Sequence, residues 1–237
     1  MIPKKIHYCW FGRGEKPKLA KKCIASWKKL CPDYEIIEWN EDNFDLDYNG
    51  YTRYCYDNKK WAFLSDFVRL YVVNQNGGVY FDTDVEVVKP IDHLLECEAF
   101  YGWQNDTEIA SGLGFGAVAG HYSLEAMLNE YAGLAQDEQG NFLLTICPIL
   151  NTRALQRFGL VLDGSKQVLG DICILTADYM NPYDDPTGRL LKTENTVSIH
   201  WCAKSWISPA LKLRSFLTRP LHRLFGTDCF AWLKRKE

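Results

Sequence analysis

Strand-like and helix-like segments alternate through the first third of the chain, and this alternation constrains the fold most. Short apolar runs at 6–10 and 34–39 have the β-branched and aromatic composition of strands. Apolar residues recur at helical spacing in 17–30 and again in 59–74. A third apolar run, 79–81, leads directly into an Asp-Thr-Asp sequence. Alternation of this kind predicts a largely parallel sheet covered by helices.

The rest of the chain has a weaker pattern and no internal repeat or low-complexity linker. We expect strands at 100–104, 112–119, 172–175 and 197–201, and helices at 121–134 and 150–158. The sequence therefore predicts a single α/β domain, residues 1–207, followed by a C-terminal segment, residues 208–237.

Asp82 and Asp84 stand at the carboxyl end of the buried run 79–81. Side chains alternate along a strand, so both carboxylates point to the same side while Thr83 points away. Ligands of open α/β sheets bind at this end of the strands, and two convergent carboxylates suit a hard divalent cation. The alternative is a pair of solvent-facing turn residues, because Asp-x-Asp also occurs by chance.

Asp66 and Arg69 are three residues apart on an otherwise apolar helix, so they share one face of it. Burying that face is unfavourable unless the two charges are paired or bind a polar group. One interpretation is an internal salt bridge that supports the fold. The other is recognition of sugar hydroxyls by a carboxylate and a guanidinium.

The distribution of charge excludes a general nucleic-acid-binding protein. The formal net charge is −3, but residues 1–30 carry +8 and residues 208–237 carry +5, so the body between them carries −16. So acidic a body would repel the phosphates of a nucleic acid.

The nine cysteines are scattered and include no C-x-x-C pair. This spacing fits neither a zinc site nor a disulfide scaffold, and it indicates a reducing compartment in which most thiols pack as small apolar groups. The start of the chain lacks an apolar stretch long enough for a signal peptide, and the apolar region 63–73 is interrupted by Asp66 and Arg69. We therefore expect a cytoplasmic protein that is soluble or at most peripheral to a membrane.

Three motifs, in order, resemble a known enzyme family. The segments 6–12 (IHYCWFG), 65–69 (SDFVR) and 77–84 (GGVYFDTD) are similar to family 32 glycosyltransferases with a D-x-D sugar-binding region. That family includes bacterial capsular polysaccharide transferases and fungal mannosyltransferases, and it is related to the large glucosylating cytotoxins. The resemblance implies an α/β GT-A fold, with a Rossmann-like mixed sheet covered by helices. It also implies retaining transfer of a hexose from a UDP- or GDP-sugar to a glycan, assisted by Mn²⁺ or Mg²⁺.

The resemblance also implies roles for individual residues. Trp10 matches an aromatic residue that stacks on the nucleotide base, although a Trp at the end of a strand can equally be a core residue. Asp66 and Arg69 match the pair that grips the donor sugar. Asp82 and Asp84 match the motif whose metal ion bridges the diphosphate, so these four charged residues are the candidate catalytic set.

A late segment, HWCAKSW at 200–206, provides the remaining candidates. His200 resembles a late metal ligand of related enzymes, and imidazole is a common ligand of Mn²⁺. Lys204 would then meet a phosphate, and Trp206 would belong to a flap over the donor. The segment departs from the closest family pattern, in which a proline stands at the place of Ser205. The alternative is a purely structural His200.

The C-terminal segment 208–237 is basic and has apolar residues at helical intervals, interrupted by Pro220. A segment of this kind can lie on an anionic membrane surface, which would place the protein at the inner face of the plasma membrane, near lipid-linked glycan acceptors. The alternative is a helix that packs on the domain with its charges in water.

Two other function classes stay open at this stage. The sequence YFDTDV at 80–85 also resembles aspartate-nucleophile phosphotransferases, although their motif usually follows the first strand of the domain. A non-catalytic sugar-binding module is the second alternative, but it gives no reason for a site suited to a metal ion and a diphosphate. The glycine-rich stretch 111–116 is not a dinucleotide loop, because it follows no first strand, and we expect it to let the backbone approach the sugar or acceptor.

Overall fold

The computed structural model describes residues 1–203, 209–226 and 229. Its centre is one large β-sheet whose strands lie in the order β2–β1–β3–β7–β5–β9–β8, with β6 paired to β5. The strands are β1 (Lys5–Cys9), β2 (Glu35–Trp39), β3 (Gly78–Tyr80), β5 (Ala99–Asn105), β6 (Glu108–Ile109), β7 (Phe115–Ala117), β8 (Gln167–Leu169) and β9 (Ile172–Leu175).

The sheet is mixed, which corrects the expectation of a largely parallel one. β1 runs parallel to β2 and β3, and β5 runs parallel to β9. β7, however, is antiparallel to both β3 and β5, and β8 is antiparallel to β9. The connections from β5 to β7 and from β8 to β9 hold no crossover helix, and such short connections join antiparallel strands. The α/β class that the family resemblance implies, a mixed sheet covered by helices, is confirmed.

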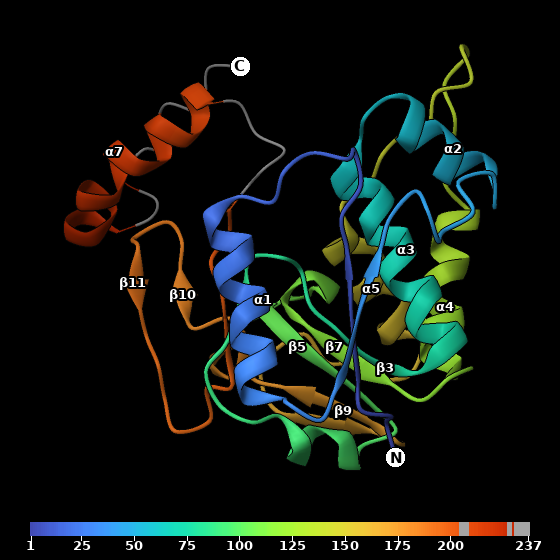
Figure 1. The fold of residues 1–237 in the computed structure, drawn as a ribbon. Helices are drawn as coiled ribbons and strands as arrows, with labels where there is room; N and C mark the ends of the chain where they lie inside the picture. Colours follow the sequence, from blue (N-terminus) through green and yellow to red (C-terminus); the bar gives the residue numbers. More distant parts are fainter. Residues whose placement is uncertain (204–208, 227–228, 230–237) are drawn as a thin grey trace.

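Helices cover both faces of the sheet (Figure 1). One face carries α1 (Lys18–Leu30), and the other carries α3 (Trp61–Asn76), α4 (Tyr122–Ala132) and α5 (Cys147–Gln156). Side chains of β3 alternate between the two layers: Val79 packs in the cluster with Trp27 of α1, and Tyr80 packs in the cluster with Leu64 of α3. The core therefore lies in two apolar layers on opposite sides of the strands.

α2 (Gly50–Asp57) has no counterpart among the expected elements. Its first turn is closed by a reciprocal capping box: the Asn49 side chain accepts from the Thr52 amide at 2.9 Å, and the Asn49 amide donates to the Thr52 hydroxyl at 3.2 Å. Such a box satisfies amides that the first turn of a helix leaves without partners. An acidic, asparagine-rich stretch directly before the helix hid this signal in the sequence.

A second, smaller strand pair carries the chain from the D-x-D motif to the C-terminal region. β4 (Val85–Val87) pairs antiparallel with β12 (Ser198–His200), and His200 stands opposite Val85. Between β4 and β12 the chain also forms the short helices η1 (Asp92–Glu96), η2 (Ser111–Leu113) and α6 (Ala177–Met180), and the hairpin of β10 (Tyr183–Asp184) and β11 (Arg189–Leu190).

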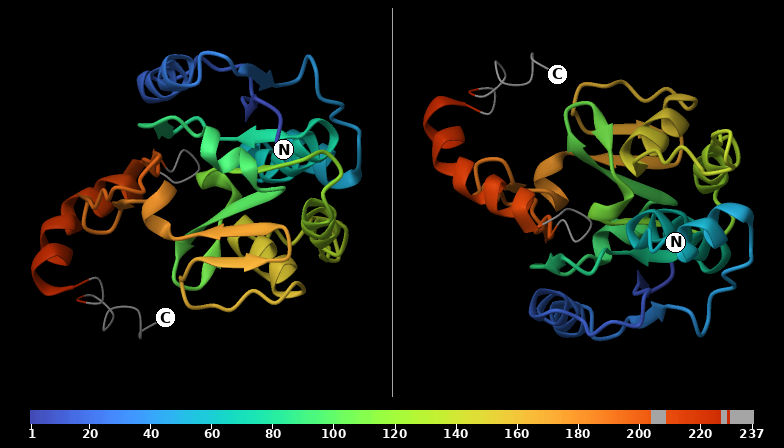
Figure 2. Two further views of the ribbon diagram at one scale, coloured as in Figure 1. Left: turned by 90° about the horizontal axis from the view of Figure 1, so that it is seen from below. Right: turned by 90° about the horizontal axis from the view of Figure 1, so that it is seen from above.

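The C-terminal helix α7 (Pro209–Phe225) projects from the side of the molecule, as both views of Figure 2 show. The helix continues through Pro220, where the sequence predicted an interruption. Within the described residues, no helix combines the length and apolar character needed to cross a membrane. The division into 1–207 and 208–237 stays a prediction.

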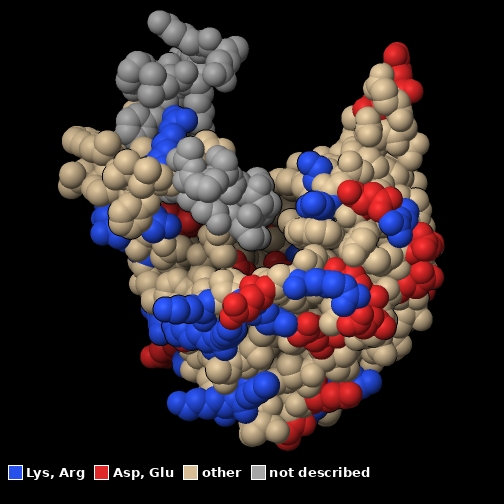
Figure 3. All heavy atoms as spheres, turned by 45° about the horizontal axis from the view of Figure 1, so that its top comes forward, with Lys and Arg blue, Asp and Glu red and all other residues tan. Residues whose placement is uncertain are grey.

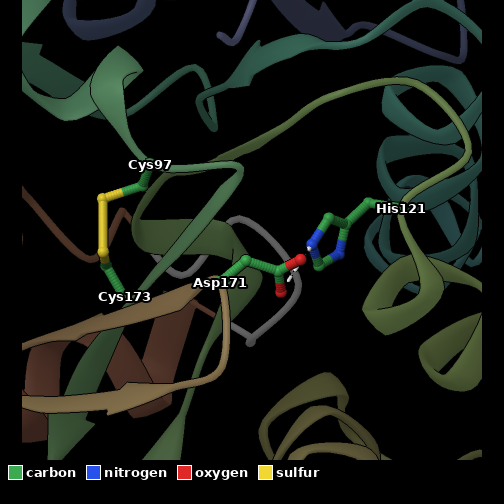
Figure 4. Close-up of a disulfide and its surroundings, with 4 residues drawn as sticks. All are labelled: Cys97, His121, Asp171 and Cys173. Carbon is green, nitrogen blue, oxygen red and sulfur yellow. Dashed lines mark ion pairs between the residues drawn. A yellow bond between two sulfur atoms is a disulfide. The ribbon is translucent and has the colours of Figure 1, made fainter.

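The cysteines behave in part as the sequence predicts. Cys97 and Cys173 form a single disulfide (Figure 4), a bond that the cysteine spacing did not predict. The two residues are 76 positions apart, but the pairing of β5 with β9 brings their Cα atoms to 6.4 Å. Beside it, His121 Nε2 lies 3.3 Å from Asp171 Oδ1. Five thiols are buried and free, as expected: Cys9, Cys23, Cys31, Cys55 and Cys147.

Candidate active site

The D-x-D aspartates and His200 converge at one place. Asp82 and Asp84 lie in the turn between β3 and β4, and His200 ends β12. One ligand atom from each of the three side chains lies within 4.8 Å of the others. Residues more than a hundred positions apart in the sequence thus form one cluster, as the sequence predicted for a metal site.

Backbone contacts hold Asp84 in place within this cluster. The Val85 amide donates to the Asp82 carbonyl at 3.0 Å and closes the turn. The Trp201 amide donates to the Asp84 carbonyl at 3.0 Å, and the Ala203 amide donates to Asp84 Oδ2 at 2.7 Å. Asp84 Oδ1 lies 3.4 Å from His200 Nε2. The pairing of β4 with β12 therefore fixes the aspartate relative to the histidine.

Asp82 is held from the other side by α3. Arg69 Nη2 lies 3.1 Å from Asp82 Oδ1 and 2.7 Å from Asp66 Oδ1. The Tyr80 hydroxyl donates to the same Asp82 oxygen at 2.9 Å, and its ring lies 5.1 Å from the Arg69 guanidinium. The salt bridge that the sequence predicted as one alternative is present, and it extends to the D-x-D motif.

The guanidinium of Arg69 is almost completely enclosed, with 3% of the residue exposed. Besides its two carboxylate partners, its Nε donates to the Ser65 carbonyl at 3.2 Å, and its Nη1 donates to the Ser111 hydroxyl at 3.4 Å and lies 3.9 Å from Cys147 Sγ. An Arg has a fixed fork of N–H donors, and here each of the three nitrogens already has an acceptor. Arg69 thus acts on the site by positioning Asp66 and Asp82.

Burial and mutual charge set the protonation of the cluster. Burial raises the pKa of Asp82 to about 6, against the attraction of Arg69, and the charge of Asp84 adds to the increase. Burial also opposes ionisation of Asp84, but the charge of His200 and the hydrogen bonds to the carboxylate outweigh it and lower the pKa of Asp84. The pKa of His200 is raised, because the Asp84 charge outweighs the effect of burial. Without a cation, Asp84 and His200 form an ion pair.

The residues present fit a divalent cation. Two carboxylates and an imidazole are a donor set that Mn²⁺ accepts, and carboxylate oxygens alone suit Mg²⁺. Gly112 of η2 contributes space: a Cβ at this position would lie 2.5 Å from Asp82 Oδ2. The sequence named the three candidate ligands but missed Tyr80 and Ser111, and the glycine-rich stretch 111–116 was its only hint of Gly112.

The remaining predicted site residues are placed as follows. Trp10 follows β1, is partly buried, donates from Nε1 to the Gly14 carbonyl at 2.6 Å, and has the Lys16 ammonium 5.5 Å from its ring. Its assignment to the nucleotide base stays a prediction. Lys204 and Trp206 lie outside the described residues.

Residues 17–101 match the family model described as "Glycosyltransferase sugar-binding region containing DXD motif". Asp66, Arg69, Asp82 and Asp84 all lie inside the matched region. The chain thus contains a segment similar to the sugar-binding region of D-x-D glycosyltransferases. The resemblance expected from the three sequence motifs is thereby confirmed.

The chain is also similar to the inositol phosphoceramide mannosyltransferase 3 of Schizosaccharomyces pombe, with 28% identity over 131 residues. The match covers 51% of this chain and 34% of that protein, so it spans about a third of the relative's length.

Similar solved structures include PaToxG glycosyltransferase, with 19% identity, a TM-score of 0.47 and coverage of 66% of this chain and 69% of that one. Another is a glycosyltransferase involved in glycosylation of the major capsid of PBCV-1, with 11% identity, a TM-score of 0.49 and coverage of 85% and 95%.

Proposed function

We propose that this chain transfers a hexose from a nucleotide-sugar to a glycan acceptor with the help of Mn²⁺ or Mg²⁺. The observation that supports this most strongly is the convergence of Asp82, Asp84 and His200 beside the buried pair of Asp66 and Arg69. A D-x-D sugar-binding region needs both elements, a place for the diphosphate and a place for the sugar.

Each residue has a separate task in this proposal. Asp82, Asp84 and His200 would hold the cation, which when bound neutralises charge on the diphosphate leaving group. Asp82 and Asp66 are fixed by the same guanidinium, so their positions relative to each other are set before the donor arrives. The Asp66 side chain is 12% exposed and the Asp82 side chain 27%, which leaves both carboxylates some access to a sugar hydroxyl.

Several finer features extend the proposal from the resemblance. The donor is a UDP- or GDP-sugar with its base on Trp10, Lys204 meets a phosphate, and Trp206 covers the donor. The transfer retains the anomeric configuration, with no nucleophile assigned. The acceptor is a surface or capsular glycan, free or lipid-linked, built in the cytoplasm at the inner face of the plasma membrane.

A thermal-unfolding screen of UDP- and GDP-sugars, each with Mn²⁺ or with EDTA, tests the proposal. A donor at about 100 times its Kd stabilises the folded state by about 2.7 kcal/mol, or roughly 5–10 °C for a chain of this size. We expect this shift with Mn²⁺, and slow hydrolysis of the same nucleotide-sugar, and we expect the Asp84→Asn variant to lose both.

Glu138→Gln, at an exposed acidic position, is the matched control and should keep both responses. The proposal is wrong if no nucleotide-sugar shifts the transition with any divalent cation, or if Asp84→Asn responds like the wild type.

No observation favours the two alternative function classes. The motif of aspartate-nucleophile phosphotransferases usually follows the first strand of the domain, but here β1 and β2 precede Asp82. Labelling of Asp82 by beryllofluoride would restore the phosphotransferase. Calorimetric affinity for a glycan without affinity for a nucleotide would favour a sugar-binding module.

A further inference from the structure

Helix α7 contacts the rest of the protein through its polar side. Arg219 Nη2 lies 3.1 Å from Asp185 Oδ1, and Arg223 donates to the Thr187 carbonyl at 2.5 Å and to the Gly188 carbonyl at 3.1 Å. These acceptors belong to the hairpin of β10 and β11. The hydrogen-bonding side of the helix is therefore turned inward.

The opposite side of α7 is apolar and lies in solvent. Leu213, Leu217 and Leu224 are 59%, 63% and 75% exposed. Helical periodicity puts these three leucines within about 40° of one another around the helix axis, and roughly 100–140° away from Arg219 and Arg223. A helix that simply packs on a water-soluble domain does the reverse, with its apolar stripe toward the core and its charges in water. The alternative of a tail packed with its charges in water therefore does not explain α7.

The charge around this apolar side indicates what covers it. Residues 208–237 carry a net charge of +5, and Arg214 is exposed between the leucines. Helix α1 has further exposed lysines, Lys18, Lys28 and Lys29, and Figure 3 shows basic side chains on the same side of the molecule as α7. A second copy of this chain would bring two basic segments together, whereas anionic lipid headgroups complement them.

We propose that α7 lies in the plane of an anionic membrane surface, with Leu213, Leu217 and Leu224 inserted at the boundary between headgroups and acyl chains. Arg214 extends along the leucines to the phosphates, as long basic side chains do at such boundaries. The hairpin contacts of Arg219 and Arg223 couple the bound helix to the domain. This inference does not depend on the transfer reaction, since it rests on the orientation of α7 alone.

Flotation of the full chain with phosphatidylcholine vesicles, with and without phosphatidylglycerol, tests this inference. We expect binding to the anionic vesicles only, weakened by added salt because the basic residues are screened. In the Leu217→Glu/Leu224→Glu variant we expect at least about tenfold weaker binding, because two inserted leucines are replaced by charges. Val168→Glu replaces an equally exposed apolar residue, 67% exposed on β8, and should bind like the wild type.

Two measurements keep this test separate from folding and from the proposed function. The thermal transition of Leu217→Glu/Leu224→Glu should equal that of the wild type, and its response to nucleotide-sugar and Mn²⁺ should be unchanged. The inference is overturned if the wild type does not bind anionic vesicles, or if the double variant binds as well. A third outcome also overturns it: light scattering shows that the wild type is a dimer and the double variant a monomer, and neither binds vesicles. The leucines of α7 would then contact a second copy of the chain.

Discussion

Replacing Arg69 by Met should be the most destabilising single change at the site. The guanidinium is 3% exposed and lies between Asp66, at 2.7 Å, and Asp82, at 3.1 Å. A methionine fills much of the same space but leaves two partly buried carboxylates facing each other without a cation. Removing one partner of a buried ion pair costs about 3–5 kcal/mol, because the remaining charge is left uncompensated.

The size of the effect makes it measurable. For a chain of about 240 residues, 1 kcal/mol corresponds to roughly 2–4 °C in Tm, so Arg69→Met should melt about 6–20 °C below the wild type. Urea unfolding followed by circular dichroism should give the same loss of unfolding free energy with an unchanged dependence on denaturant.

A second substitution separates the charge effect from loss of packing. If uncompensated charge is the cause, Asp66→Asn in the Arg69→Met background should recover part of the loss, by about 1–3 kcal/mol, because one of the two repelling charges is gone. Asp66→Asn alone should destabilise. The reasoning is refuted if Arg69→Met costs less than about 1 kcal/mol, or if the losses of the two single variants simply add.

Three further predictions concern other parts of the molecule. Burial lowers the pKa of His7, which accepts a hydrogen bond from Trp39. Because the unfolded state binds a proton at higher pH than the folded state does, the free energy of unfolding should fall as the pH drops below about 6.5. In urea titrations at a series of pH values, His7→Gln should weaken that pH dependence. Gly112→Ala should lower Mn²⁺ affinity in calorimetry by about tenfold or more, because the new methyl displaces the Asp82 carboxylate, whereas Gly133→Ala, which meets only ordinary contacts, should not. Cys97→Ser opens the disulfide that closes a loop of 76 residues and should reduce the unfolding free energy by up to about 4 kcal/mol, and an unchanged denaturation midpoint would contradict this.

The sequence predicted secondary structure best in segments whose local apolar pattern matches the packing that they adopt in the fold. The expected segments 6–10, 34–39 and 79–81 correspond to β1, β2 and β3, which are parallel neighbours joined by helices, as strand-helix alternation implies. The segments 17–30 and 59–74 correspond to α1 and α3 within two residues at each end. In these two helices the apolar residues recur with the period of the helix, so they lie on one face, and that face packs on the core.

Prediction failed where the structure depends on which strands pair, because local sequence patterns do not determine strand pairing. β7 has glycine at its centre, and its place between β3 and β5 follows from short connections rather than from its own sequence. The disulfide of Cys97 with Cys173 likewise follows from the pairing of β5 and β9. The candidate ligands could be named from residue type, but the contact of Arg69 with Asp82 could not, because it joins a helix to a turn on the next strand.

The two aspartates of the D-x-D motif are similar in the sequence but differ in the structure. Asp82 gives its Oδ1 to Arg69 and Tyr80, and its Oδ2 lies against Gly112. Asp84 instead gives its Oδ2 to a backbone amide, and its Oδ1 faces His200. Each carboxylate thus uses one oxygen to fix its own orientation and presents the other to the cluster. Because a neutral amide presents only one oxygen, asparagine at either position would have to give up either the fixed orientation or the ligand atom.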